Sequence, residues 1–447
     1  MTGMLAEGAL LVTERGDQVE VVELLGSGGQ GEVYRVRTAD GGQAALKWYY
    51  PACATAEQQG IVQGLVARDF EDDRFLWPLA FVPAVADAGP GFGYLMELRP
   101  DRFRGLPALF RRQLRTSTVA LLTACLQTVE AYQALHSRGI AYRDISWGNL
   151  FFDPANGDIL VCDNDNAVVE GDASGIGGTM EFMAPELVRG DPGARPGTQS
   201  DLHSLSVLLF MVLMNHHPLK GRLELAIHCL DEAAERQLYG RQPVFMFDPV
   251  DSSNRPDPVE QGAVAHAWEA FPQSLRALFV HNFTVGLRDP SARVRESQWR
   301  DALRAVLDAV VECAGCGRQN ATEPSATGPG ACWGCGRTLV LPPRLVVITP
   351  PPRSERRILL RRGARLQQHH LVAEPARHDY GDRTLVAELV EHPSRPGRFG
   401  LLNRSDSAWT GLRTDGTTQQ IAPGQTVPLR AGLELDLGPA WALVVAP

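Results

Sequence analysis

The segment Tyr142–Asn149, which reads Y-R-D-I-S-W-G-N, constrains this chain more than any other part of its sequence. It places Asp144 and Asn149 in D-x4-N spacing behind an apolar stretch, and the acidic cluster Asp163-Asn164-Asp165 follows. The spacing alone is a weak signal, because aspartate and asparagine are common loop residues. It indicates a functional site only if the segments before and after it fit the same chemistry.

A glycine-rich segment lies upstream, where Gly26, Gly28, Gly31 and Val33 form G-x-G-x-x-G-x-V. A hairpin with glycine at its tip lets backbone N–H groups approach phosphates without interference from a Cβ atom. The β-branched and aromatic run Val33–Val36 predicts a strand after the glycines, whereas a dinucleotide-binding fold requires a helix there. The alternative is a plain glycine-rich turn.

Further motifs follow in order along the chain. An apolar run ends at Ala45-Leu46-Lys47, and the tripeptide Ala184-Pro185-Glu186 lies downstream. Asp201 precedes a long apolar run, and Arg293 comes near the end of this region. With these motifs in this order, residues 9–310 resemble a eukaryotic-type Ser/Thr protein kinase domain.

The resemblance implies a bilobal α+β fold and a role for each motif. It implies that Asp144 is the catalytic base and that Lys47 binds the α- and β-phosphates of ATP. Asn149 and Asp163 are implied to hold Mg²⁺. The other residues implied to bind ATP are Gly26, Gly28, Gly31, Val33, Ala45, Met96 (the gatekeeper) and Glu97 (at the hinge between the lobes).

The resemblance implies two further contacts. Glu186 is expected to pair with Arg293 inside the large lobe, and Thr179 is expected to contact the catalytic loop. Ser174 and Thr179 are also candidate autophosphorylation sites, and for Thr179 the alternative is a structural role.

The sequence departs from the family pattern at several positions. Ser146 replaces a lysine that helps to neutralise the transferred phosphoryl group, and Asn164-Asp165 replaces the Phe-Gly that follows the metal-binding aspartate. Asp165 adds a carboxylate, which we expect to lie near the metals and either to tighten their binding or to raise a neighbouring pKa.

The helix glutamate that pairs with the ATP-binding lysine in this family is hard to place. The expected helix Thr55–Ala67 contains a single acidic residue, Glu57, which is therefore the candidate partner of Lys47. The alternative is that Glu57 only complements the helix dipole.

The motifs favour a kinase that transfers the γ-phosphoryl group of ATP to protein hydroxyl groups, its own included. All four groups that handle ATP, metal and proton are present: Lys47, Asp144, Asn149 and Asp163. Two alternatives stay open. One is a nucleotide-binding pseudokinase that acts as a scaffold, and the other is a small-molecule phosphotransferase of related fold, which Ala184-Pro185-Glu186 disfavours.

Four cysteines predict a second kind of site. Cys313, Cys316, Cys332 and Cys335 form C-x2-C…C-x2-C, and Gly-Arg follows each pair. Two such knuckles present four thiolates to one tetrahedral Zn²⁺. Because cysteine fills every position, we expect a structural zinc ribbon at residues 311–340; disulfides are the alternative. The loop between the pairs has no basic cluster, which favours a spacer or protein-docking role.

Residues 341–447 alternate short apolar runs with Gly, Asp and Pro turns, which predicts an all-β sandwich. The stretch from Gly400-Leu401-Leu402-Asn403 to Leu437-Gly438 resembles the back half of a forkhead-associated (FHA) domain, a family that binds phosphothreonine. The Ser-Arg-x-His loop of that family is not evident, and Gln367–His370 stands near its place, which favours an interaction module. A strand is expected at His370–Ala373.

The expected organisation is therefore a kinase domain at residues 1–310, with a small lobe at about 9–100 and a large lobe at about 101–310, then the ribbon and the β domain. Apolar residues at helical spacing predict several helices. They are Thr55–Ala67, Arg111–Ser137, Gln199–Met214, Leu223–Glu235, Val259–Phe271, Ser274–Val285 and Glu296–Val311.

The whole-chain composition agrees with a protein of several globular domains, at 447 residues and 44% hydrophobic content. The net charge of −9 disfavours general nucleic-acid binding. No signal peptide is evident and no apolar run is long enough to cross a bilayer, so a cytoplasmic location without membrane contact is expected. The domain combination is similar to bacterial kinases of tellurite-resistance-type gene clusters. That resemblance implies von Willebrand A-type proteins and a metal-dependent phosphatase as partners, besides protein substrates.

Overall fold

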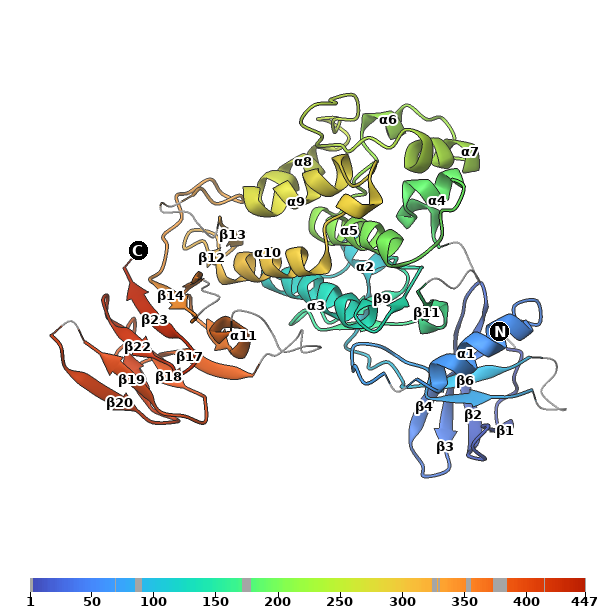
Figure 1. The fold of residues 1–447 in the computed structure, drawn as a ribbon, viewed down its shortest axis with the longest axis horizontal. Helices are drawn as coiled ribbons and strands as arrows, with labels where there is room; N and C mark the ends of the chain where they lie inside the picture. Colours follow the sequence, from blue (N-terminus) through green and yellow to red (C-terminus); the bar gives the residue numbers. More distant parts are fainter. Residues whose placement is uncertain are drawn as a thin grey trace.

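The structure, a computed structural model, describes residues 3–68, 70–84, 91–170, 178–323, 328, 330–350, 355–372, 384–413 and 415–446. Figure 1 shows a β-rich small lobe at the N-terminus, a helical large lobe in the middle and a β domain at the C-terminus. The expected bilobal α+β fold is confirmed. Within the described ranges, no helix combines the length and the apolar character needed to cross a membrane.

The small lobe is built on a six-stranded sheet with the order β1-β2-β3-β4-β6-β5. Its strands are β1 (Leu10–Val12), β2 (Gln18–Ser27), β3 (Gly31–Thr38), β4 (Gln43–Tyr49), β5 (Ala80–Val82) and β6 (Gly93–Met96). Helix α1 (Ala56–Val66) begins after Thr55, whose side chain accepts a hydrogen bond from Gln58 N. The glycine-rich segment forms the turn between β2 and β3, and no helix follows it, as the sequence predicts.

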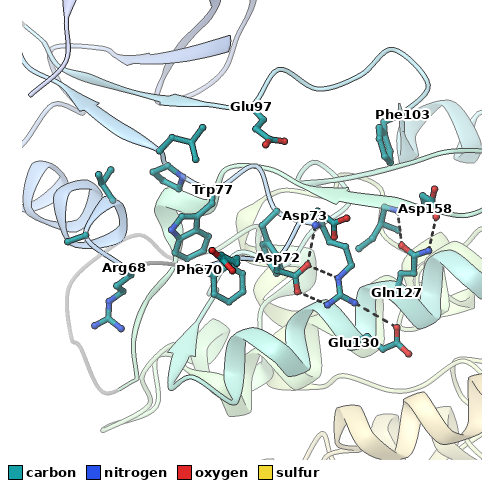
Figure 2. Close-up of a pocket in the computed structure, with 18 of the residues that line it drawn as sticks. Arg68, Phe70, Asp72, Asp73, Trp77, Glu97, Phe103, Gln127, Glu130 and Asp158 are labelled. Carbon is teal, nitrogen blue, oxygen red and sulfur yellow. Dashed lines mark hydrogen bonds and ion pairs between the residues drawn. The ribbon is translucent and has the colours of Figure 1, made fainter. Parts of the chain in front are cut away.

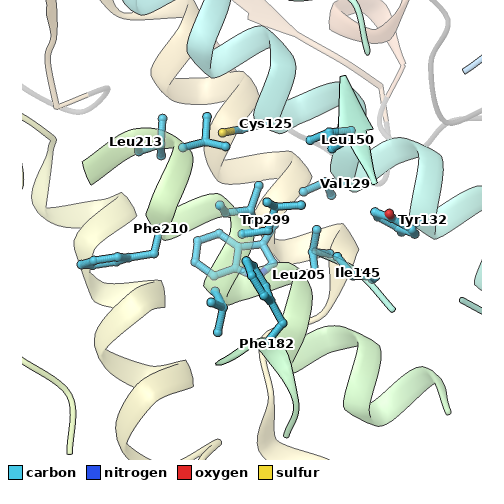
Figure 3. Close-up of a cluster of buried hydrophobic side chains, with 14 of the residues drawn as sticks. Cys125, Val129, Tyr132, Ile145, Leu150, Phe182, Leu205, Phe210, Leu213 and Trp299 are labelled. Atoms are coloured by element: carbon cyan, nitrogen blue, oxygen red, sulfur yellow. The ribbon is translucent and has the colours of Figure 1, made fainter. Parts of the chain in front are cut away.

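The large lobe is organised around α3 (Thr118–His136) and α5 (Thr198–Met214), which are buried over most of their length. Their apolar side chains gather around Trp299 of α10 (Glu296–Asp308), as Figure 3 shows. Full burial of one large apolar side chain stabilises the fold by about 1.5–3 kcal/mol. This core therefore gives the polar loops of the lobe a rigid support.

The remaining elements of the large lobe and of its connection to the small lobe are short. The strands are β7 (Arg104–Gly105), β8 (Ile140–Ala141), β9 (Leu150–Phe152), β10 (Ile159–Val161) and β11 (Val168–Val169). The α-helices are α2 (Leu106–Phe110), α4 (Pro185–Arg189), α6 (Arg222–Leu225), α7 (Glu232–Glu235), α8 (Gly262–Glu269) and α9 (Gln273–Thr284). The other helical turns are η1 (Asn164–Asn166), η2 (Met180–Phe182), η3 (Arg236–Arg241) and η4 (Pro290–Ala292).

The segment between α1 and β5 ties the small lobe to the large lobe. Leu76 N donates to Val161 O at 2.9 Å, and Val161 N donates to Arg74 O at 2.7 Å, so the segment lies alongside β10. The Arg74 guanidinium also approaches the buried Glu130 of α3, at 3.8 Å, and Arg304 of α10 binds Glu130 at 2.7 Å. These ion pairs connect the small lobe to two central helices of the large lobe.

The C-terminal domain consists of two antiparallel sheets with the orders β15-β14-β23-β22-β19-β20 and β16-β17-β18-β21. Apolar side chains from both sheets, among them Leu345, Val386 and Trp409, form one core, which agrees with the expected sandwich. The strands are β14 (Arg344–Ile348), β15 (Glu355–Leu359), β16 (Arg365–Gln367), β17 (Leu385–Glu391), β18 (Phe399–Asn403), β19 (Trp409–Leu412), β20 (Thr418–Ile421), β21 (Thr426–Pro428), β22 (Glu434–Asp436) and β23 (Trp441–Val445).

The expected strand at His370–Ala373 is wrong. Gln368–Leu371 forms the short helix α11, and Ala373 lies outside the described residues. Gln367 N donates to His370 Nδ1 at 2.8 Å, and this side-chain contact closes a helical turn that strand periodicity does not reveal. Both His369 and His370 are buried, and His370 Nε2 pairs with Asp308 of α10 at 3.1 Å.

Four expected helices of the large lobe are shorter than predicted. The one expected at Arg111–Ser137 begins only at Thr118, where the Ser117 side chain caps it by accepting a hydrogen bond from Ala120 N, and the one expected at Val259–Phe271 spans Gly262–Glu269. The expected helix Leu223–Glu235 is divided into α6 and α7, and most of the intervening segment is exposed and has no core to pack against. The expected helix Glu296–Val311 ends at Asp308, because Val310 and Val311 instead form a strand of the cysteine-bearing region.

Candidate active site

Lys47 lies on β4, and only 4% of the residue is exposed. Its Nζ donates to both carboxylate oxygens of Asp165 at 2.9 Å, to Asp163 Oδ1 at 3.3 Å and to Gln30 Oε1 at 3.1 Å. Burial opposes the charged form, but the carboxylates of Asp165 and Asp163 outweigh burial and raise the pKa of Lys47. The ammonium group therefore stays charged at neutral pH.

Asp165 has a fully buried side chain that accepts hydrogen bonds on both oxygens. Tyr94 OH donates to Oδ1 at 3.1 Å, and Tyr49 OH donates to Oδ2. Burial favours the neutral acid, but Lys47 outweighs burial and lowers the pKa of Asp165. Because these donors occupy both oxygens, Asp165 binds Lys47 and raises its pKa, which agrees with the second of the two effects expected of this carboxylate.

The expected pairing of Lys47 with Glu57 is wrong. Glu57 is exposed in the first turn of α1, where a carboxylate complements the helix dipole. The neighbouring Gln58 points toward the site instead, because its Nε2 donates to Asp165 O at 3.3 Å and to Tyr49 OH at 3.2 Å. Sequence reasoning missed Asp165 as the partner of Lys47, because the two residues lie 118 positions apart in the sequence.

Asp144 and Asn149 lie on the loop between β8 and β9. Asn149 Nδ2 donates to Asp144 O and to Asp144 Oδ2, both at 2.9 Å. Thr179 donates to Asp144 Oδ1 from its N at 3.0 Å and from its Oγ1 at 3.1 Å. Tyr142 OH donates to Cys162 O, which joins this loop to the segment that carries Asp163. The structure thus brings Asp144, Asn149 and Asp163 together, with Thr179 at the loop as expected.

Asp163 and Arg143 both adopt left-handed backbone conformations, with φ of 53° and 71°. Residues other than glycine rarely adopt such conformations, and those that do cluster at functional sites. The Asp163 side chain is 43% exposed, so it has room for a ligand that the buried Asp165 lacks. Carboxylate and amide oxygens are the groups that Mg²⁺ prefers, so Asp163 and Asn149 fit the expected metal.

A buried carboxylate on α5 holds the loop between β8 and β9 in place. Asp201 accepts hydrogen bonds from Tyr142 N at 2.6 Å and from Arg143 N at 2.9 Å. His136 contacts Asp201 through Nε2 at 3.1 Å and Glu296 through Nδ1. Burial opposes the charged imidazolium, but these two acids outweigh burial and raise the pKa of His136 to about 10. The loop therefore rests on a buried ionic cluster.

The three motif glycines differ in what they face. A Cβ atom at Gly31 would lie 2.1 Å from Trp48 O, so this position needs glycine for close backbone packing. Gly26 and Gly28 face open space, and a phosphate can approach their backbone. Gln30, which the sequence analysis did not single out, reaches Lys47 from the same turn. The sequence feature that could have identified Gln30 is its position between the motif glycines Gly28 and Gly31.

The apolar residues predicted to enclose adenine lie together. Ala45 stands opposite Met96 in the pairing of β4 with β6, and Val33 packs against the same cluster. Leu98, which follows the expected hinge residue Glu97, also packs there, and so do two residues that sequence reasoning missed, Phe151 and Cys162. Phe151 follows Asn149 closely and Cys162 precedes Asp163. Their nearness to these motif residues is the sequence feature that could have identified them.

A cavity of about 1160 Å³ between the lobes is separate from this network. Figure 2 shows it beside Trp77, Glu97, Glu130 and Asp158, and among the residues predicted for the site only Glu97 lines it. The acids Glu130 and Asp158 on its wall are paired with arginines and not with residues of the Lys47 network.

The four predicted zinc ligands form one cluster, with all their sulfur atoms within 4.8 Å of one another. Cys313 Sγ lies 3.6 Å from Cys335 Sγ, and Cys316 Sγ lies 3.6 Å from Cys332 Sγ. Four thiolates about 2.3 Å from one zinc stand about 3.8 Å apart in a tetrahedron, so the cluster fits the metal. No disulfide joins these four cysteines, and the 3.6 Å between their sulfur atoms exceeds the length of a disulfide bond, about 2.05 Å, which favours the metal over that alternative.

The cysteine region is fixed to the large lobe. Strands β12 (Val310–Glu312) and β13 (Gln319–Ala321) pair, and β12 follows α10 almost directly. Gln319 Oε1 accepts a hydrogen bond from Val119 N at 2.9 Å at the start of α3. Gly317 and Gly336, after the two knuckles, have φ of 71°, which explains why glycine follows each cysteine pair.

Comparison with known proteins agrees with this geometry. A family model described as the protein kinase domain matches residues 96–255. CBL-interacting protein kinase 4 of Oryza sativa subsp. japonica is 28% identical over 208 residues, which cover 44% of this chain and 45% of that protein. Protein kinase C delta type of Mus musculus is 36% identical over 93 residues, 20% of this chain and 13% of that protein.

A third relative, the putative ribosomal protein S6 kinase alpha-1 of Caenorhabditis elegans, is 40% identical over 98 residues, 21% of this chain and 12% of that protein. The chain thus spans less than half the length of these relatives. The fold, the polar network and the matched segment together define a protein kinase domain within this chain. It is followed by a four-cysteine cluster and antiparallel β-sheets.

Proposed function

We propose that this chain is a Mg²⁺- and ATP-dependent Ser/Thr protein kinase. The observation that carries the proposal is one connected network: Lys47 binds Asp163, and Asn149 binds Asp144. Tyr142 links the two parts through Cys162 O. The proposal for Ser/Thr substrates rests on the relatives, since several are named as serine/threonine-protein kinases.

Each group has a separate task in the proposed reaction. Lys47 binds the α- and β-phosphates, and the backbone at Gly26 and Gly28 covers the phosphates. Asn149 and Asp163 would hold Mg²⁺, which would neutralise charge on the transferred phosphoryl group. Asp144 orients the attacking hydroxyl group and accepts its proton. Catalysis thus comes from positioning and from electrostatic stabilisation.

Thr179 supports this assignment of Asp144. Its backbone N–H and its hydroxyl group both donate to Asp144 Oδ1, so the orientation of the carboxylate is fixed before substrate arrives. The hydroxyl group is committed to this contact, which favours the structural role of Thr179 over phosphorylation. Ser174, the other candidate autophosphorylation site, lies outside the described residues.

The regions after the kinase domain are proposed to be accessory. The four cysteines bind one structural Zn²⁺, because no ligand position is left open for water. The ribbon is a rigid connection, since Gln319 fixes it to α3. The β domain is proposed as a protein-interaction module.

The proposed function is tested by transfer of labelled γ-phosphoryl from ATP to the chain itself and to a protein mixture. We expect the wild type to transfer label in Mg²⁺. Asp144→Asn keeps the shape of the side chain and removes the base, so it should lower the rate by about 10²-fold or more. If the wild type binds Mg·ATP and transfers no label to any protein, the pseudokinase alternative holds and the proposal is overturned.

A further inference from the structure

We propose that Asp165 replaces the helix glutamate that positions the ATP-binding lysine in protein kinases, so that Lys47 is held by the metal-binding loop and not by α1. In protein kinases the strand lysine must pair with an acid of the small-lobe helix before the site is complete. The inference rests on the proposed function and adds a positioning residue to it.

Helix α1 offers Lys47 no acid. Its one acidic residue, Glu57, is exposed and is not among the groups that Lys47 Nζ contacts. The α1 residue that faces the site is Gln58, a neutral amide that donates to Asp165 O and to Tyr49 OH. The helix therefore contacts the carboxylate that holds Lys47 without supplying it.

Asp165 has the properties that such a positioning acid needs. Both of its oxygens lie 2.9 Å from Lys47 Nζ, and its side chain is fully buried. Tyr49 and Tyr94, from two strands of the small-lobe sheet, donate to the same carboxylate and fix its direction. A charge-assisted pair with additional donors is stronger and more directional than a neutral hydrogen bond.

The position of Asp165 links two functions in one segment. Asp163, the proposed metal ligand, precedes the short turn η1 (Asn164–Asn166), and Asp165 lies within that turn. The same short segment therefore carries the proposed metal ligand and the partner of Lys47, and Lys47 Nζ contacts both carboxylates. A shift of α1 leaves this pair intact, because the helix contributes only the Gln58 amide. Lys47 is positioned by the loop that binds metal.

The test compares four variants of the full chain with the wild type. Asp165→Asn removes the charge and keeps the volume. The double variant Asp165→Ala/Gln58→Glu moves the acid back to α1, because the Gln58 amide already reaches the edge of the Asp165 site. The single variant Asp165→Ala is the reference for the double variant. Glu57→Gln is the matched control on the same helix. The measurements are the KM for ATP, kcat, and the affinity for Mg·ADP by titration calorimetry.

We expect Asp165→Asn to lower kcat/KM for ATP by about 10²-fold, the size of the effect of a misplaced catalytic group, and to weaken binding of Mg·ADP. Glu57→Gln should stay within about twofold of the wild type. The kcat/KM for ATP of the double variant should be at least about tenfold higher than that of Asp165→Ala. A merely structural role for Asp165 predicts no recovery, because an acid on α1 does not refill the space.

The outcomes separate this inference from the proposed function. If the wild type transfers phosphate and Asp165→Asn keeps its kcat/KM and its affinity for Mg·ADP, the inference is overturned and the proposed function stands. The inference is also overturned if Gln58→Glu gives no recovery in the Asp165→Ala background. If the wild type binds Mg·ADP and transfers no phosphate, the proposed function fails, and the calorimetric comparison still decides the role of Asp165. A wild type that binds no nucleotide overturns both.

Discussion

Arg293 holds Glu186 through two hydrogen bonds, Nη1 to Oε1 at 2.9 Å and Nη2 to Oε2 at 2.7 Å. The Arg293 side chain is fully buried, and its Nη1 also donates to Gln199 O at the start of α5. The pair therefore fastens the segment before α10 to the short helix α4, which contains Glu186, and to the central helix of the lobe. The role of this ion pair is structural, because it joins elements that pack beneath the loops of the candidate site.

Replacing Arg293 by Ala should lower the free energy of unfolding of the large lobe by about 3 kcal/mol, because it leaves a largely buried carboxylate without its partner. Hydrogen exchange of the α5 amides in the native state measures this directly. Arg37, which pairs with Glu20 at the surface, is the control, and Arg37→Ala should cost about 0.5 kcal/mol or less. Equal costs for the two variants would contradict the assignment.

Thr179→Ala should lower kcat by about tenfold and leave the KM for ATP unchanged. The variant loses the hydroxyl group that donates to Asp144 Oδ1, and a hydrogen bond to a charged group contributes about 1.5–3 kcal/mol. Thr179→Ser keeps the donor and should retain most of kcat. A Thr179→Ala enzyme with the kcat of the wild type would show that this contact does not orient the base.

Stability should fall as the pH rises toward 10, through the titration of His136. Its pKa in the folded chain is raised to about 10, above the value of about 6.5 in an unfolded chain. The contribution is complete below about pH 6.5 and is lost as pH rises through about 10; its size is on the order of 5 kcal/mol. Urea unfolding at several pH values should show this loss in the wild type and a much smaller one in His136→Gln. Parallel pH profiles would contradict the ion cluster.

The purified chain should contain one zinc ion, measured by elemental analysis, and Cys332→Ser should lose it. Because the ligand set is complete, removal of the metal by a chelator should unfold the ribbon and abolish hydrogen-exchange protection at β12 and β13. Phosphotransfer should change by less than about twofold, since the cysteines lie outside the catalytic network. A chain that lacks zinc and keeps full ribbon protection would contradict a metal site.

Local patterns predicted much of this fold and site. The glycine-rich turn, the D-x4-N loop and the paired C-x2-C knuckles are short-range features, and each lies where its spacing indicates. The ion pair between Glu186 and Arg293 followed from the family resemblance.

The parts that were missed depend on contacts between distant segments or on side chains. Whether Lys47 binds Glu57 or Asp165 depends on which face of α1 packs against the sheet. The spacing of residues in the sequence does not predict that face. The strand predicted at the histidine pair is wrong because a side chain, His370 Nδ1, closes the turn of α11. Helix α10 ends early because Val310 and Val311 find strand partners in the ribbon.

The central claim is that Lys47, Asn149 and Asp163 converge on one metal-bound nucleotide. Titration calorimetry of ATP with and without Mg²⁺ tests it most directly, on the wild type and on Asp163→Asn. We expect Mg²⁺ to strengthen ATP binding to the wild type, and we expect Asp163→Asn to lose this gain while remaining folded. The claim would be contradicted if the affinity of the wild type for ATP did not change with Mg²⁺, or if Mg²⁺ raised the affinity of both proteins equally.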